Sequence, residues 1–140
     1  MSARFCCVIL HDPDTDSLLL ELRPPTAAAA ANKLTCFGGK LEAFEDAPSC
    51  ALRECREELG WAPPSGLAPA VDLYVGGELC AHFFLARAPS RDAPLRFEPG
   101  REGVWLTVAE ARADPRLSPW HAAVLSAWQR GAARADHPSS

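Results

Sequence analysis

The residues best suited to chemistry lie between positions 39 and 61, in the segment GKLEAFEDAPSCALRECREELGW. Glu54, Glu57 and Glu58 are spaced i, i+3 and i+4, so on a helix all three carboxylates project from one face. Without a cation, like charges at these spacings disfavour a helix by a few tenths of a kcal/mol per pair. Mg²⁺ prefers oxygen ligands and keeps several water ligands, which leaves positions for phosphate oxygens. The spacing therefore indicates a metal site that can accept a diphosphate.

Three further residues of the segment can support such a site. Arg53 lies four residues before Glu57, close enough on a helix to pair with a glutamate and hold its orientation. Gly39 allows the preceding loop to approach closely, and Glu45 can accept hydrogen bonds from loop amides. We therefore expect a loop and a helix that together form a cradle for a metal ion.

A helix rich in glutamate and arginine more often forms a solvated surface, which is the alternative to a metal site here. Here seven residue identities occur at fixed spacings: a glycine, a glutamate, the Arg-Glu pair, the Glu-Glu pair and a final glycine. From average residue usage, that arrangement arises by chance in fewer than roughly one chain of this length in a million. The pattern therefore favours a functional site.

The segment resembles the Nudix box, G-x5-E-x7-R-E-U-x-E-E-x-G-U, in which U is a bulky aliphatic residue. Two U positions depart from the pattern, because they hold Cys55 and Trp61, which concern the packing of the helix more than its metal face. The likeness to the Nudix hydrolase family (MutT-like) extends over about residues 3 to 131. It implies an α/β (α+β) fold, namely an α/β/α sandwich with a mixed central sheet. All seven fixed identities are present, at Gly39, Glu45, Arg53, Glu54, Glu57, Glu58 and Gly60.

The resemblance also implies the reaction. Nudix hydrolases use Mg²⁺ or Mn²⁺ to cleave the diphosphate linkage of a nucleoside diphosphate joined to another group. The expected substrate is a small molecule, such as an oxidised nucleoside triphosphate or an ADP-ribose-like compound. The choice among these compounds, the number of metal ions and the identity of the general base stay open at this point.

The roles implied for individual residues follow from their places in the motif and beside it. Expected catalytic residues are Glu54, Glu57 and Arg53, with Glu54 either a further ligand or the base. Expected metal ligands are Gly39, Glu54, Glu57 and Glu58, with a fourth carboxylate from Glu98 or Glu102, of which Glu102 is our choice. Expected substrate-binding residues are Arg23, Gly38, Gly39 and Lys40.

Two other functions are considered beside hydrolysis. A Nudix-like domain can bind or sense a nucleotide without cleaving it, but such modules usually lack glutamates of the box, and all of them are present here. An isomerase of isopentenyl diphosphate type would have a longer chain, an altered box and a catalytic cysteine. No cysteine of this chain has an evident activating partner in the sequence.

Composition excludes several classes of partner. The chain has 140 residues with 14 basic and 18 acidic side chains, so its formal charge of −4 argues against a nucleic acid polymer as partner. No apolar run is long enough to span a membrane, and the first residues lack the features of a signal peptide. We therefore expect a cytoplasmic protein, with a homodimer as an open alternative. Six cysteines without a CxxC pair are expected to be reduced and apolar rather than zinc ligands.

The elements that must position the site follow from apolar runs, caps and turn residues. The pattern predicts one domain over residues 1–131 and a flexible tail over residues 132–140. Residues 24–32 are expected to form either a short helical turn or a mobile loop. Strands are predicted over residues 3–10, 17–22, 33–37, 73–75, 79–85 and 103–106, and helices over residues 46–59, 107–113 and 118–131.

Overall fold

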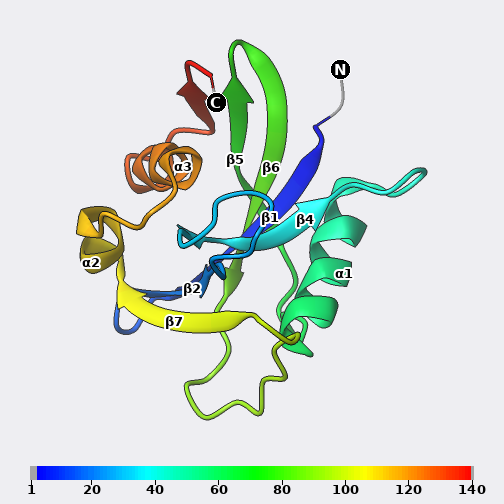
Figure 1. Ribbon diagram of the computed structural model, residues 1–140, viewed down its shortest axis with the longest axis vertical. Helices are drawn as coiled ribbons and strands as arrows, with labels where there is room; N and C mark the ends of the chain where they lie inside the picture. The colour runs from blue at the N-terminus through cyan, green and yellow to red at the C-terminus, as the bar shows by residue number, and fades with distance from the viewer. Residues whose placement is uncertain (1–2, 140) are drawn as a thin grey trace.

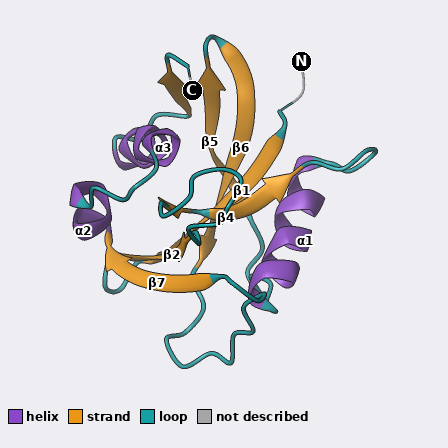
Figure 2. Ribbon diagram, viewed as in Figure 1, coloured by secondary structure: helices purple, strands orange, loops and turns teal. Residues whose placement is uncertain are grey.

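The computed structural model describes residues 3–139 and shows a mixed α/β fold. Figure 1 shows the helices on two sides of the strands, and Figure 2 distinguishes helices, strands and loops. The elements are β1 (Phe5–Asp12), β2 (Ser17–Leu22), β3 (Leu34–Thr35), β4 (Phe37–Lys40), α1 (Ala47–Leu59), β5 (Ala68–Val75), β6 (Glu78–Arg87), β7 (Glu102–Thr107), α2 (Val108–Ala113), α3 (Pro119–Gln129) and β8 (Arg134–His137).

The strands form one mixed sheet, as predicted. Its hydrogen-bonded order is β3-β2-β1-β6-β5-β8, and in addition β4 pairs with β1 and β7 pairs with β2. The pairs β1–β6 and β5–β8 are parallel, whereas the other pairs are antiparallel. Helix α1 covers one face of the sheet, and α2 and α3 cover the other (Figure 1). The expected α/β/α sandwich with a mixed central sheet is therefore confirmed.

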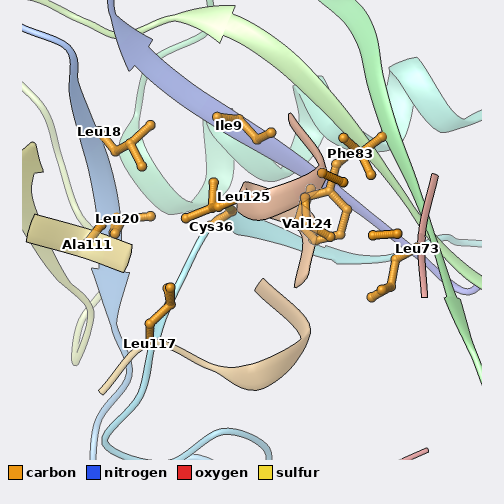
Figure 3. Close-up of a cluster of buried hydrophobic side chains, with 14 of the residues drawn as sticks. Ile9, Leu18, Leu20, Cys36, Leu73, Phe83, Ala111, Leu117, Val124 and Leu125 are labelled. Carbon is orange, nitrogen blue, oxygen red and sulfur yellow. The ribbon is translucent and has the colours of Figure 1, made fainter. Parts of the chain in front are cut away.

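Each face of the sheet packs a separate hydrophobic core, because side chains alternate along the strands. In β1, Cys7 and Ile9 face α2 and α3, whereas Cys6 and Val8 face α1. Figure 3 shows the core beneath α2 and α3, with Leu125 of α3 against the sheet. The six cysteines are unbonded and buried, as the sequence predicted, at Cys6, Cys7, Cys36, Cys50, Cys55 and Cys80.

The helix of the Nudix-like segment begins and ends at the residues that its sequence signals indicate. Asp46 accepts a hydrogen bond from the Ser49 N–H at 2.9 Å, which satisfies a free donor of the first turn. Gly60 adopts a left-handed conformation with φ of 61°, and its N–H donates to the Arg56 carbonyl at 3.0 Å. The buried face of α1 includes Ala51. This buried face packs against β4 and β1.

The predicted flexible tail is corrected at residues 134–137, because they form β8. This strand pairs in parallel with β5, so that Leu73 lies opposite Ala135, which is 2% exposed. The Arg134 guanidinium lies 3.7 Å from the centre of the Tyr74 ring. Local sequence did not indicate a strand, since arginine, alanine and aspartate have weak strand preference and the pairing depends on a distant segment.

The other predicted strands and helices are present, with two corrections. The strand predicted over residues 33–37 is divided into β3, which pairs with β2, and β4, which pairs with β1 and continues through both glycines to Lys40. The Gly76-Gly77 turn joins β5 and β6 as expected, with positive φ at both glycines, but β5 begins at Ala68 rather than at Leu73. Over residues 3–139 the structure contains no helix long and apolar enough to cross a membrane.

Candidate active site

Gly38 and Gly39, expected in a loop, belong to strand β4, which lies directly against the acidic face of α1. In the pairing of β1 with β4, Gly39 is opposite Cys6 and Gly38 is opposite Cys7. A Cβ atom on Gly39 would lie 2.5 Å from the Glu54 carboxyl carbon, so only glycine allows this approach. The two glycines therefore bring backbone of β4 beside the carboxylates of α1.

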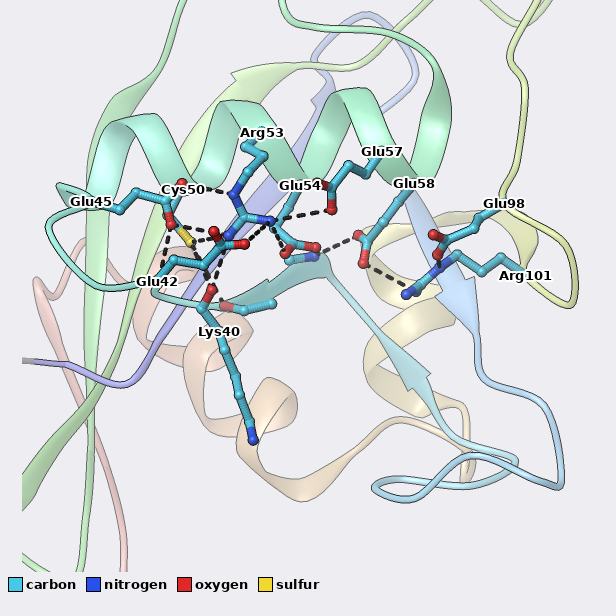
Figure 4. Close-up of polar contacts among 12 residues, drawn as sticks. Lys40, Glu42, Glu45, Cys50, Arg53, Glu54, Glu57, Glu58, Glu98 and Arg101 are labelled. Carbon is cyan, nitrogen blue, oxygen red and sulfur yellow. Dashed lines mark hydrogen bonds and ion pairs between the residues drawn. The ribbon is translucent and has the colours of Figure 1, made fainter.

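Arg53 is the centre of the hydrogen-bond network on this face (Figure 4). Its guanidinium donates to both Glu45 oxygens, at 2.7 and 3.0 Å, and to Glu54 at 2.8 Å. It also donates to Glu57 at 3.2 Å and to the Lys40 carbonyl at 3.1 Å. The predicted pairing of Arg53 with glutamates is thus present, and it holds three carboxylates and the β4 backbone in one arrangement.

Glu45 links the loop before α1 to this network. Its carboxylate accepts the Glu42 N–H at 3.0 Å, as expected for a residue that orders the loop. The hydrogen bonds from Arg53, followed by that from the Glu42 N–H, lower the pKa of Glu45 to about 2. Glu45 is therefore a fixed anion that orients Arg53 over the whole physiological pH range.

The three box glutamates differ in burial. The Glu57 side chain is 51% exposed, whereas those of Glu54 and Glu58 are 12% and 2% exposed. Glu58 accepts the Gly38 N–H at 3.0 Å on one oxygen and contacts Arg101 at 3.1 Å with the other. Burial raises the pKa of Glu58 above its usual range, although the charge of Arg101 acts in the opposite direction.

The donor set fits a hard divalent cation. Carboxylate oxygens and backbone carbonyl oxygens are the ligand types that Mg²⁺ and Mn²⁺ prefer. Among residues 3–139 there is no group of three or more His, Cys, Asp or Glu side chains already arranged to hold a metal ion. In this arrangement Arg53 holds Glu54 and Glu57, and Arg101 holds Glu58. Arg53 contacts one oxygen each of Glu54 and Glu57, whereas both oxygens of Glu58 are engaged, by the Gly38 N–H and by Arg101. Metal binding at Glu58 therefore requires this carboxylate to exchange a contact.

The structure distinguishes between the two candidates for a fourth carboxylate. The Glu98 N–H donates to the Glu58 carbonyl at 3.3 Å, so Glu98 lies beside the box helix. Glu102 is opposite Leu22 in the pairing of β7 with β2, whereas Gly103 is opposite Glu21. Directly opposed residues share a face of the sheet, so Glu102 projects toward the face with Leu22 and away from Glu58. In this structure Glu98 is thus closer to the box helix than Glu102, and the identity of the fourth carboxylate stays a prediction.

The predicted substrate-binding side chains lie at different places around the site. Arg23 donates to the Ala29 carbonyl at 2.8 Å and contacts Glu21 at 3.4 Å, so in this structure it orders the loop over residues 24–32. That segment is a loop rather than a helical turn. Lys40 is exposed and extends away from the glutamates, although its carbonyl binds Arg53 (Figure 4).

Two residues of the site, Glu21 and Arg101, were not found from the sequence. Glu21 lies on β2 and is 1% exposed, and it forms a short ion pair with Arg101. A single glutamate within the apolar strand SLLLEL was the one available signal, because a buried carboxylate requires a partner. Arg101 comes from the loop before β7, and nothing local in the sequence connects it to β2 or α1.

Comparisons with known proteins agree with this fold. The structure of a MutT protein from Methanosarcina mazei Go1 is similar with a TM-score of 0.73 and 18% identity, covering 93% of this chain and 96% of that one. A MutT Nudix hydrolase from Burkholderia pseudomallei is similar with a TM-score of 0.69 and 24% identity, covering 90% and 98%. The E. coli ORF135 protein is similar with a TM-score of 0.65 and 25% identity, covering 90% and 87%.

The sequence itself gives a family assignment. No match was found among curated proteins. The NUDIX domain, however, matches residues 2–128, which include α1 and strands β1 to β7. The match covers most of the chain, and the arrangement of the box residues on one face of α1 accompanies it. The chain therefore belongs to the Nudix family.

Proposed function

We propose that this protein is a metal-dependent pyrophosphohydrolase that cleaves the diphosphate linkage of a small nucleotide. Candidate substrates are an oxidised nucleoside triphosphate and an ADP-ribose-like compound. The observation that supports this proposal best is the arrangement around Arg53. One guanidinium holds Glu45, Glu54 and Glu57 beside the glycines of β4, and the three box glutamates lie on one face of α1.

In this proposal, Glu54, Glu57 and Glu58 hold Mg²⁺ or Mn²⁺, with Glu98 as the fourth carboxylate. The bound metal would screen the charge of the diphosphate and lower the pKa of a water molecule. Gly38 and Gly39 let the substrate approach the backbone of β4. Arg53 keeps the carboxylates in place, and a carboxylate of this cluster accepts the proton of the attacking water.

The remaining parts of the proposal concern the whole molecule. We infer that residues 1–131 form the catalytic domain and that β8 belongs to the sheet of this domain. We also infer that the protein acts in the cytoplasm on small molecules. Homodimer formation is compatible with this function but is not required by it.

A non-catalytic nucleotide-binding domain is the second candidate function. It is the weaker one, because a module that only binds has no need for a set of carboxylates positioned by Arg53. Both candidates predict that nucleotides raise the melting temperature, but only the hydrolase predicts that products form.

The test is product analysis by chromatography and mass spectrometry. The substrate panel contains nucleoside triphosphates, oxidised nucleoside triphosphates, ADP-ribose, NADH and dinucleoside polyphosphates, each with Mg²⁺ or Mn²⁺. We expect cleavage of at least one class at its diphosphate linkage and no cleavage with a chelator. If nucleotides stabilise the protein and none is cleaved, the binding function replaces the hydrolase.

A further inference from the structure

One arginine outside the Nudix box gathers three carboxylates at the edge of the site. Arg101 forms a short ion pair with Glu21 and contacts Glu58 at 3.1 Å and Glu98 at 2.6 Å (Figure 4 shows Glu58 and Glu98). The Glu21 and Glu58 side chains are 1% and 2% exposed, and Arg101 is 22% exposed. Arg101 is thus the partner that two buried carboxylates share.

Glu58 has no oxygen free of contacts in this arrangement. One oxygen accepts the Gly38 N–H at 3.0 Å, and the other contacts Arg101. A divalent cation bound to Glu58 would lie beside the guanidinium, and two positive charges this close repel each other strongly in a partly buried site. Metal and Arg101 therefore compete for the same carboxylate.

Glu21 gives Arg101 a second anchor that is independent of the metal site. Glu21 projects from β2, not from the box helix, and its carboxylate pairs with Arg101 at the oxygen that does not contact Arg23. Thr35 is directly opposite Glu21 in the pairing of β2 with β3, so the two side chains share a face. The Thr35 hydroxyl is buried and has no hydrogen-bond partner among residues 3–139. An unused acceptor thus lies on the same face as the Glu21 carboxylate.

We propose that Arg101 is a positioning residue that competes with the divalent metal for Glu58, and that Glu21 retains Arg101 when the metal binds. This inference rests on the proposed function, because it concerns the metal of that reaction. In the metal-free protein Arg101 is paired with Glu58. On metal binding the guanidinium keeps Glu21, with the Thr35 hydroxyl as a further acceptor on the same face, whereas Glu58 and Glu98 turn from Arg101 to the metal. Arg101 and Glu21 together therefore set the metal affinity of the site.

The proposal predicts opposite effects for two substitutions in the same ion cluster. Arg101→Met removes the competitor and its positive charge beside the cation, so Mn²⁺ should bind roughly tenfold more tightly. Glu21→Gln removes the second anchor, so Arg101 pairs more strongly with Glu58. Mn²⁺ should therefore bind more weakly, by a similar factor. If the ion cluster is purely structural, both variants should be less stable, and their Mn²⁺ affinities should not change in opposite directions.

The experiment is a titration of the full chain with Mn²⁺, followed by electron paramagnetic resonance of the free ion and without any substrate. Arg23→Met is the matched control, because it also removes one positive charge. The Arg23 guanidinium contacts the same Glu21 carboxylate, but within residues 3–139 it forms no ion pair with Glu58. We expect a clearly smaller change for Arg23→Met than for Arg101→Met. Melting temperatures in chelator show whether each variant folds.

If Arg101→Met does not fold, Arg101→Lys replaces it. A lysine lacks the planar guanidinium that bridges two carboxylates. The Arg101→Lys protein should therefore bind Mn²⁺ more tightly than the wild-type protein does. Equal or weaker Mn²⁺ binding by the Arg101 variant, or unchanged binding by Glu21→Gln, overturns the inference. If the wild-type protein binds Mn²⁺ and cleaves a nucleotide while Arg101→Met binds no more tightly, this inference alone fails. If the wild-type protein neither binds Mn²⁺ nor cleaves any nucleotide, the proposed function fails with it.

Discussion

Replacing Glu57 with glutamine should separate catalysis from stability. The Glu57 side chain is 51% exposed, and its one ion pair within residues 3–139 is with Arg53, at 3.2 Å. Glutamine keeps the size of the side chain but removes the charge that a metal ligand needs. The substitution therefore disturbs the proposed metal site while it leaves the core untouched.

The effect on stability follows from two opposing contributions. Loss of an exposed i,i+4 ion pair costs about 0.3–0.5 kcal/mol. Relief of the like-charge repulsion between Glu57 and Glu54, which are three residues apart on α1, returns a few tenths of a kcal/mol. The net change in the free energy of unfolding should lie within about 0.5 kcal/mol, which corresponds to roughly 1–3 °C in melting temperature for a domain of this size.

The effect on catalysis should be much larger. Altering a group that only orients a metal ligand reduces affinity or activity roughly 10–100-fold, so removal of a charged ligand should reduce turnover by more than about 100-fold. Turnover of a cleaved nucleotide with Mg²⁺ and the melting temperature in chelator are the two measurements. Wild-type turnover in the variant would refute the assignment of Glu57, and a loss of many degrees would refute the stability argument.

Three further predictions concern other residues of the structure. Burial lowers the pKa of His121 to about 4, so the folded state binds fewer protons than the unfolded state between pH 6.5 and 4. The free energy of unfolding should therefore fall by on the order of 3 kcal/mol as the pH drops through this window. The fall should be smaller in His121→Gln, and denaturant unfolding at pH 7 and pH 4.5 measures both. Gly39→Ala should displace the Glu54 carboxyl and reduce turnover while circular dichroism stays unchanged, since that carboxyl is the end of a flexible side chain. A lysine at position 53 cannot donate to both oxygens of Glu45 as the arginine does, so Arg53→Lys should lower turnover and Mn²⁺ affinity roughly 10–100-fold. Wild-type values for both quantities would contradict the role of Arg53.

Sequence predicted the elements whose signals are local. Asp46 and Gly60 mark the ends of α1, and Gly76 and Gly77 mark the turn of a hairpin, because each acts through its own backbone conformation or through hydrogen bonds to near neighbours. The spacing of the box glutamates likewise places them on one face of a single helix. Arg53 could be assigned to these glutamates because its partners lie on the same helix or the loop before it.

The parts that sequence did not predict depend on contacts between distant segments. β8 becomes a strand only because β5 offers an edge to pair with, and Ala135 fills space in a core made by other elements. The choice between Glu98 and Glu102 depends on the register of β7 against β2. The ion pair of Glu21 with Arg101 joins residues 80 positions apart, so no local pattern contains it.

Hydrolysis in ¹⁸O-labelled water tests the central claim most directly. The cleaved nucleotide of the panel is incubated with the wild-type protein and Mg²⁺, with and without a chelator, and the products are analysed by mass spectrometry. We predict that one phosphorylated product gains one ¹⁸O atom and that no product forms in the chelator. Products without the label, or equal rates in the chelator, would contradict a metal-dependent attack of water on the diphosphate.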